Sequence, residues 1–166
     1  RCPPDSEAWP GARLGLPWSP GVNMHLSAIL KQKGADVAHV APTTTVAEVV
    51  QVLASRRIGA VLVMDSARQV LGIVSERDVV RTLAEQGGRT LAMTAGQLMT
   101  TGLHTAGPQT SVMEATGMMT VGRFRHLPVL EDGQLLGIVS IGDVVKARIS
   151  EQDQEVDSLK AYVAGG

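Results

Sequence analysis

Apolar positions in the first half of the chain follow two different periods. From Val46 to Leu53 they recur at helical spacing, behind a Thr-rich segment that supplies an N-cap. Two apolar runs of strand length follow, GAVLVM (59–64) and VLGIVS (70–75), and a second helix is predicted to begin near Ser75. The pattern therefore predicts a unit in the order helix, strand, strand, helix.

The same unit recurs in the second half of the chain. VLGIVSERDVV (70–80) returns as LLGIVSIGDVV (135–145), and Pro42 and Pro108 lie 66 residues apart with matching residues after each. The recurrence predicts two copies, at about 37–82 and 103–148. Because a two-stranded ribbon is marginal alone, the copies are expected to pack together and share one core in a mixed fold of the α+β class.

The second copy shows the order of elements most clearly. Helical spacing runs from Val112 to Met119, the strand HLPVLE (126–131) follows, and a second helix is predicted to begin near Ser140. Asp132-Gly133 suits a tight hairpin between its two strands.

The ends of the chain differ from the repeats. Residues 1–23 hold five of the eight prolines and show no helical or strand period, so they are expected to be a disordered or non-native tail, with Met24 as a natural start. The expected organisation is a tail at 1–23, a first repeat with a lead-in helix at 24–86, a linker at 87–98, a second repeat at 99–150 and a helical extension at 151–166.

A heptad pattern runs through the last predicted helix. Its apolar positions are four and three residues apart, and Gln152 interrupts them with a polar side chain. Acidic residues occupy another face. Packing of this helix on its own module and contact between two copies remain equal alternatives. The residues of the pattern are Val145, Ile149, Gln152, Val156, Leu159 and Val163.

Composition narrows the class of protein. The 166 residues are 44% hydrophobic and 19% charged with a net charge of −1, so neither nucleic acid nor an acidic membrane surface is an expected partner. The longest apolar run, 58–64, is far shorter than the ~20 residues of a membrane span. Cys2 is the only cysteine, which excludes an internal disulfide and favours a cytoplasmic location.

The duplicated Ser-x-x-Asp has two interpretations. Serine at an N-cap with an acidic residue three positions later is a capping box, which spacing alone favours. Alternatively, a carboxylate at a helix start next to a strand end can accept the hydroxyls of a ribose, while the helix N-terminus favours anionic groups. Basic residues near the start of each first strand can bind phosphate or simply face solvent: Arg56, Arg57, Arg123, Arg125 and His126.

Catalytic patterns are missing from the sequence. It contains no G-x-S-x-G, H-E-x-x-H, Walker or G-x-G-x-x-G motif. The four histidines, at 25, 39, 104 and 126, have no metal-ligand spacing. We therefore expect a protein that is not an enzyme and has no metal site.

Taken together, RHLPVLEDGQLLGIVSIGDVV (125–145) and RIGAVLVMDSARQVLGIVSERDVV (57–80) resemble two tandem cystathionine-β-synthase-type (CBS) domains. The resemblance covers about residues 24–150 and implies a pseudo-twofold Bateman module of bacterial stand-alone type. It implies no required cofactor and a regulatory adenosine-containing ligand, with AMP favoured over ATP, ADP, NAD(H) and S-adenosylmethionine. It also implies a homodimer in which the last helix assists.

The resemblance further implies two clefts, each formed by both repeats. The first is favoured because Ala60 is small and the KQKG segment (31–34) supplies a cation, whereas Phe124 either narrows the second or stacks on a base. Leu62 in place of the second copy's Pro128, and Gly142 in place of a side chain, depart from the pattern. The residues expected at the first cleft are Lys33, Gly34, Ala38, Ile58, Ala60, His126, Ser140, Ile141 and Asp143, and those at the second are Thr100, His104, Arg57, Phe124, Ser75, Arg77 and Asp78.

Three functions follow as hypotheses. The first is a sensor that changes conformation or dimer geometry when an adenine nucleotide binds. The second is an interaction scaffold with empty clefts, and the third is a regulatory subunit of a separate enzyme or transporter.

Overall fold

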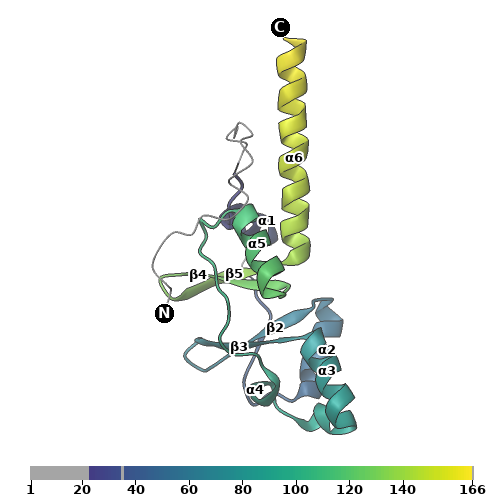
Figure 1. Ribbon diagram of the computed structural model, residues 1–166. Helices are drawn as coiled ribbons and strands as arrows, with labels where there is room; N and C mark the ends of the chain where they lie inside the picture. Colours follow the sequence, from purple (N-terminus) through teal and green to yellow (C-terminus); the bar gives the residue numbers. More distant parts are fainter. Residues whose placement is uncertain (1–22, 35, 166) are drawn as a thin grey trace.

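The computed structural model describes residues 23–34 and 36–165, so the predicted tail lies outside the described residues except for Asn23. Two small sheets lie next to each other, with helices on their outer sides, and a long C-terminal helix extends away from both (Figure 1). This arrangement is the α+β fold with two tandem repeats that the sequence predicts.

The first repeat contains a three-stranded sheet in the order β1-β2-β3. The predicted helix–strand–strand–helix order is confirmed, and an additional short strand, β1, runs parallel to β2. Two residues are too few to produce a sequence period, so β1 was not predictable. The elements are β1 (His39–Val40), α2 (Val46–Arg56), β2 (Ala60–Met64), β3 (Val70–Ser75) and α3 (Glu76–Gln86).

The second repeat has the same order around an antiparallel pair of strands. A single parallel bridge between Ala106 and Val129 replaces the short first strand. The predicted hairpin turn is confirmed, since Asp132 and Gly133 have φ angles of 49° and 76°, as a two-residue type I′ turn requires. The elements are α5 (Val112–Gly122), β4 (His126–Glu131), β5 (Gln134–Ser140) and α6 (Ile141–Ala164).

The segments that precede the two repeats are exchanged between them. Helix α1 (Leu26–Lys33) comes before the first repeat but packs on β5 and α6 of the second. The predicted linker folds as a 3₁₀ helix, η2 (Gly87–Ala92), and a short helix, α4 (Ala95–Leu98), and α4 packs on α2, α3 and β3 of the first repeat. The sequence repeat and the packing therefore divide the chain differently.

Two glycines at equivalent positions permit this exchange. A Cβ atom on Gly72 would lie 2.7 Å from the carbonyl oxygen of Thr100, and one on Gly137 would lie 2.6 Å from a methyl group of Leu30. Both distances are shorter than carbon side chains tolerate. The duplicated glycine of VLGIVS and LLGIVS thus leaves room for the segment that arrives from the other repeat.

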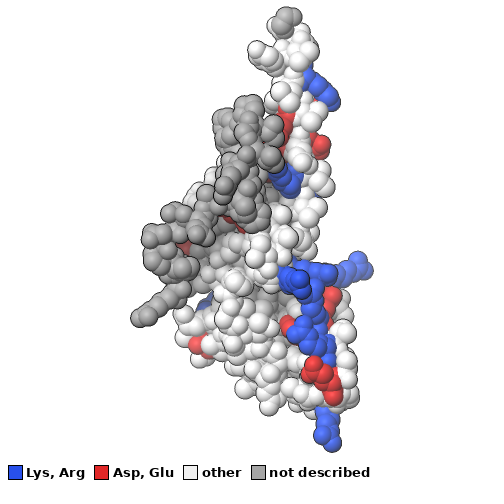
Figure 2. Space-filling model, viewed as in Figure 1, with Lys and Arg blue, Asp and Glu red and all other residues white. Residues whose placement is uncertain are grey.

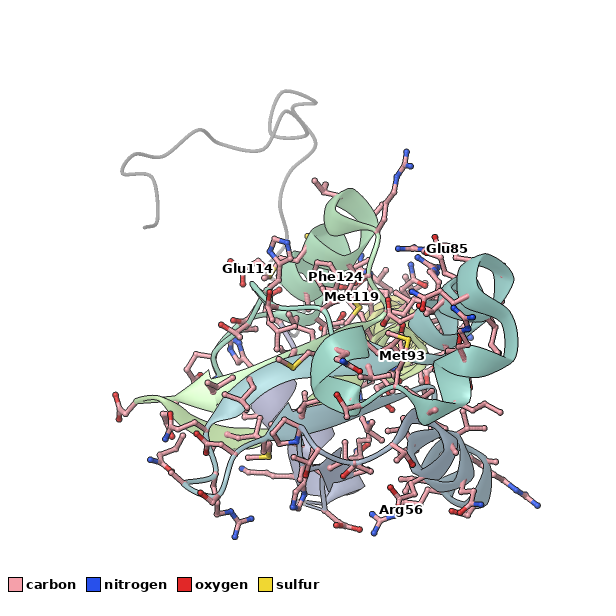
Figure 3. The ribbon with its side chains drawn as sticks, turned by 90° about the horizontal axis from the view of Figure 1, so that it is seen from below. Arg56, Glu85, Met93, Glu114, Met119 and Phe124 are labelled. Atoms are coloured by element: carbon pink, nitrogen blue, oxygen red, sulfur yellow. The ribbon has the colours of Figure 1, made fainter. Side chains whose placement is uncertain are left out.

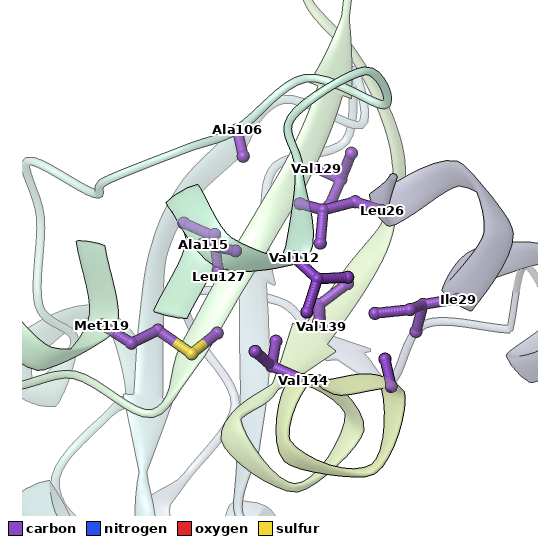
Figure 4. Close-up of a cluster of buried hydrophobic side chains, with 11 residues drawn as sticks. Leu26, Ile29, Ala106, Val112, Ala115, Met119, Leu127, Val129, Val139 and Val144 are labelled. Atoms are coloured by element: carbon purple, nitrogen blue, oxygen red, sulfur yellow. The ribbon is translucent and has the colours of Figure 1, made fainter. Parts of the chain in front are cut away.

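Two clusters of buried apolar side chains form the core. One lies between α1, α5, β4, β5 and α6 (Figure 4). The other lies under α2 and α3 and includes Ala95 from α4. All five residues of β2 are buried, so both faces of the first sheet are covered. Each cluster is completed by the lead-in segment of the other repeat.

Among the described residues, helix α6 is buried only in its first half. Val144, Ala147 and Glu151 are its buried residues, and every described residue from 152 to 165 is exposed. Packing on its own module therefore accounts for only part of this helix. Within residues 23–34 and 36–165, no helix is both long and apolar enough to cross a membrane.

Candidate functional site

A cavity of ≈ 550 Å³ lies between the two repeats. Both repeats contribute to its walls, through the starts of α3 and α6, the segment that follows α4, and the connection from α5 to β4. The residues that line it are Gly59, Ile73, Ser75, Glu76, Arg77, Asp78, Arg81, Thr100, Gly102, Leu103, His104, Gly122, Arg123, Phe124, Arg125, His126, Ser140, Ile141 and Gly142.

Two helices begin at this cavity. The first residues of α3 and α6 are held in the same way, because the N–H of Glu76 donates to the carbonyl of Gly59 (3.0 Å) and that of Ile141 donates to the carbonyl of Arg125 (2.8 Å). The N-terminal end of a helix carries a partial positive charge. The two helix starts therefore add positive potential to the walls.

The Ser-x-x-Asp sequences form capping boxes at both helix starts. Ser75 is the N-cap of α3 and pairs with Asp78, and Ser140 is the N-cap of α6 and pairs with Asp143. In the first pair, Asp78 Oδ2 accepts from both the N–H (2.8 Å) and the hydroxyl (2.7 Å) of Ser75. Asp78 Oδ1 takes no part in the capping box, so capping leaves one carboxylate oxygen for another donor.

The cavity is lined by four arginines but by only two carboxylates, those of Glu76 and Asp78. Figure 2 shows Lys and Arg side chains gathered between the base of α6 and the helices below it. Arg77 Nη1 donates to the carbonyl of Arg123 (3.2 Å) and so connects α3 of the first repeat to the end of α5 in the second. The excess of positive charge suits an anionic ligand. These arginines are Arg77, Arg81, Arg123 and Arg125.

An aromatic pair forms another part of the wall. The rings of His104 and Phe124 are stacked, with centroids 4.9 Å apart and planes 9° from parallel. Phe124 also packs beside the buried Met119, next to α5 (Figure 3). The pair gives the cavity a flat apolar surface, of the kind on which a nucleobase can stack.

His126 lies between the two predicted clefts. A Cβ atom on Gly59 would lie 3.2 Å from its ring, so the absence of a side chain at Gly59 gives the ring its space. Burial and the positive charge of Lys33 lower the pKa of His126, and the carboxylates of Glu76 and Asp143 only partly offset this. A neutral imidazole can donate or accept a hydrogen bond.

The residues of the first predicted cleft meet around an ion pair. Lys33 Nζ lies 2.7 Å from Asp143 Oδ2 and also donates to the carbonyl of Ile138 (3.1 Å). Partial burial opposes ionisation of Asp143. The hydrogen bond and charge of Lys33 and the N–H of Ser140 outweigh this effect and lower its pKa. Lys33 and the capping box therefore both use Oδ2 of Asp143, and Lys33 adds a positive charge beside the carboxylate that the resemblance assigns to a ribose.

The cavity corresponds to the second predicted cleft more than to the favoured first one. Of the first set, His126, Ser140 and Ile141 line it. Six of the seven residues of the second set do so, and Arg57, the C-cap of α2, is not among the lining residues. The six are Thr100, His104, Phe124, Ser75, Arg77 and Asp78.

Some lining residues were absent from the predicted clefts. Arg81 is four residues after Arg77 on α3, and this helical spacing was a signal that the two share a face. Arg123 and Arg125 were noted as basic but assigned to neither cleft. Gly59 and Gly102 carry no chemical signal in a single sequence.

The described segments hold no cluster of three or more His, Cys, Asp and Glu side chains placed to bind a metal ion.

The architecture and this cavity define a tandem-repeat module of the class that the sequence resembles. The family description "CBS domain" matches residues 33–85 and 95–150, and the chain belongs to the CBS-domain family.

Known relatives include other CBS-domain proteins. The chain is 38% identical over 149 residues to "CBS domain-containing protein CBSX3, mitochondrial" from Arabidopsis thaliana, which covers 85% of this chain and 72% of that protein. Other Arabidopsis relatives are longer, and the chain spans 23% of one of them, CBSCBSPB1.

Solved structures share the fold. The CBS-domain protein ATU1752 from Agrobacterium tumefaciens is 42% identical with a TM-score of 0.74, over 75% of this chain and 99% of that one. The CBS domain protein PAE2072 from Pyrobaculum aerophilum, solved in complex with AMP, is 26% identical with a TM-score of 0.64, over 72% of this chain and 89% of that one.

Proposed function

We propose that this protein is a non-enzymatic sensor that binds an adenosine-containing ligand, with AMP favoured, in the cavity between its repeats. The observation that carries the proposal is the composition of the cavity wall, where one capping carboxylate, four arginines and a stacked aromatic pair face the same ≈ 550 Å³. The complex of PAE2072 with AMP supports the choice of ligand. ATP, ADP, NAD(H) and S-adenosylmethionine are the competing ligands.

Each part of such a ligand has a matching group. Asp78 Oδ1 is available to accept the ribose hydroxyls, because the capping box uses Oδ2. Arginines near the starts of α3 and β4 suit the phosphate. The ring pair of His104 and Phe124 offers the base a flat surface.

A signal then follows from contacts with both repeats. A ligand shifts a conformational equilibrium only by its different affinities for the two states. A ligand in this cavity touches the starts of α3 and α6 together, so its binding depends on how the two repeats are arranged.

The proposal includes a homodimer in which α6 takes part. Exposed apolar side chains on α5 and α6 support it, among them Met113, Val121 and Leu159. A regulated protein encoded elsewhere remains a separate candidate partner.

The equivalent aspartates provide a matched test of the site. Asp78→Ala and Asp143→Ala each remove one capping carboxylate, so each is expected to cost about 1 kcal/mol of stability. If the ligand binds as proposed, Asp78→Ala abolishes AMP binding in calorimetry and Asp143→Ala retains it.

Other outcomes distinguish the alternatives. The reverse pattern would assign the ligand to the first cleft. If AMP, ATP, NADH and S-adenosylmethionine all leave the melting temperature of the intact protein unchanged, the sensor proposal fails and the scaffold or subunit hypotheses gain.

A further inference from the structure

A face of α6 that is directed away from its buried residues carries a second interaction surface. Five of the six heptad residues are apolar, and these five are 46% to 78% exposed, whereas Gln152 is the polar member of the set. Water-exposed apolar residues in a continuous line mark a surface that another element covers. We name Val145, Ile149, Gln152, Val156, Leu159 and Val163 the α6 seam.

We propose that the α6 seam forms a parallel, in-register two-stranded coiled coil with the same helix of a second copy of this chain. The inference rests on the homodimer proposed above and specifies its orientation, register and residue pairs. Spacings of four and three place Ile149, Val156 and Val163 at a positions, and Val145, Gln152 and Leu159 at d positions. All three a residues are β-branched and Leu159 stands at a d position, and β-branched residues at a with leucine at d favour a parallel pair of helices.

The seam is directed away from its own module. The buried stripe of α6, Val144, Ala147 and Glu151, is centred roughly 130° around the helix from the seam at ~100° per residue. The same helix can therefore pack on its module through one face and on a second helix through the other. Figure 1 shows the C-terminal half extending beyond α1 and α5 without a neighbour among the described elements.

Flanking charges distinguish the parallel from the antiparallel orientation. In a parallel pair each g residue faces the e residue five positions later in the other chain. Glu155 then faces Lys160 and Arg148 faces Asp153, so both kinds of pair have opposite charges. Lys160 and Arg148 now contact Asp157 (3.7 Å) and Glu151 (3.2 Å) of their own helix, at exposed or half-buried positions from which both can also reach across.

An antiparallel pair with the same overlap brings like charges together. If a positions of one chain pair with d positions of the other along the whole seam, Asp153 lies beside Asp153 of the second copy. Lys146 of each chain then lies beside Lys160 of the other. Like charges at such positions are destabilising. Gln152 also meets its own copy only in the parallel register, where the two polar side chains can hydrogen-bond to each other.

The seam begins at the edge of the cavity. A shallow apolar hollow beside α6 is lined by Ile141, Gly142, Val145, Lys146 and Ile149, and the first two of these also line the cavity. The coiled coil would thus start within one helical turn of the candidate ligand site.

Sedimentation of the intact chain tests the seam. The intact protein is expected to sediment at about twice 17.5 kDa, and Leu159→Glu at the monomer mass. Gln154→Glu, which adds the same charge on the same exposed helix outside the seam, is expected to remain dimeric.

A charge reversal tests the flanking pairs. Glu155→Lys should weaken the dimer roughly tenfold, because it creates two Lys–Lys contacts between the chains. The double variant Glu155→Lys with Lys160→Glu should restore the dimer.

Cross-linking tests the orientation. In a Cys2→Ser background, Leu159→Cys is expected to form an interchain disulfide on mild oxidation, because the two copies of residue 159 are adjacent only in the parallel arrangement. In the antiparallel arrangement they lie ~15 Å apart along the axis, beyond disulfide reach.

The outcomes separate this inference from the proposals on which it rests. A monomeric intact chain overturns both the homodimer and the coiled coil. A dimer that Leu159→Glu leaves intact keeps the homodimer and overturns the coiled coil. A dimer in which Leu159→Cys does not cross-link overturns the parallel orientation. None of these results alters the calorimetric test of the ligand site.

Discussion

Asp78 and Asp143 occupy equivalent positions but have different neighbours. Both cap a helix through a serine three residues earlier. Asp143 is paired with Lys33, which α1 brings from 110 residues away, whereas Asp78 lies in a wall with four arginines. The same fold therefore gives the two carboxylates different charged neighbours.

Removal of Lys33 is expected to have a pH-dependent effect on stability. Because Lys33 helps to lower the pKa of Asp143 in the folded state, the pair stabilises the protein above the unfolded pKa of ~3.9 and loses this effect as the pH falls through the folded pKa. Both side chains are partly exposed, so Lys33→Met should cost only about 0.5 kcal/mol at pH 7.

Urea denaturation measures this effect. The difference between Lys33→Met and the unchanged protein should be present at pH 7 and shrink near pH 3. Lys31→Met, on the exposed surface of the same helix, is the control. A difference that grows with acidification would contradict the role of the ion pair.

At the level of elements, local pattern predicted most of the fold. The four predicted strands were located to within one residue, since VLGIVS and HLPVLE match β3 and β4. The predicted N-caps are observed at Thr45, Ser75 and Ser140. The residues that cap a helix or form a hairpin turn are close neighbours in the chain, so a single sequence is enough to predict these features.

Contacts between distant residues were not predictable in the same way. The sequence favoured the first cleft because Ala60 is small and the KQKG segment supplies a cation, and nothing local indicated that Lys33 lies 2.7 Å from Asp143. Likewise, Gly59 and Gly102 line the cavity only because of the way the two repeats pack. Which cleft binds the ligand stays a prediction for calorimetry.

The exchanged segments make a prediction about the two equivalent glycines. Gly72→Ala should destabilise the protein by about 1–3 kcal/mol, because its new methyl group meets a backbone oxygen that cannot move without disturbing β3. Gly137→Ala should cost less, since the obstructing atom is the end of the Leu30 side chain, which can rotate.

Chemical denaturation ranks these variants. Gly88→Ala, where an added Cβ atom meets nothing within 4 Å, serves as the control and is expected to be close to neutral. A larger loss for Gly137→Ala than for Gly72→Ala would show that the two lead-in segments are not held as described.

At the scale of the whole molecule, the two repeats depend on each other. Leu26 and Ile29 of α1 are part of the core of the second repeat, and Ala95 of α4 is part of the core of the first. Neither cluster is complete without a segment that belongs, by sequence, to the other half.

We therefore expect one cooperative unfolding transition for both repeats. The calorimetric and van't Hoff enthalpies should agree, as they do for a two-state domain. In hydrogen exchange, β2 and β4 should be protected to a similar extent, while residues 152–165 of a monomeric variant such as Leu159→Glu exchange quickly. Two resolved transitions would contradict this interdependence.

The exchange of α1 and α4 also changes what a break in the chain would do. The start of η2, at Gly87 and Gly88, is exposed and lies on the covalent connection between the two halves. If a protease cut there, the first half would still hold the second through α1, and the second would hold the first through α4. Such a nicked protein is expected to remain a folded two-fragment complex, which means that the integrity of the module depends on reciprocal packing more than on that one peptide bond.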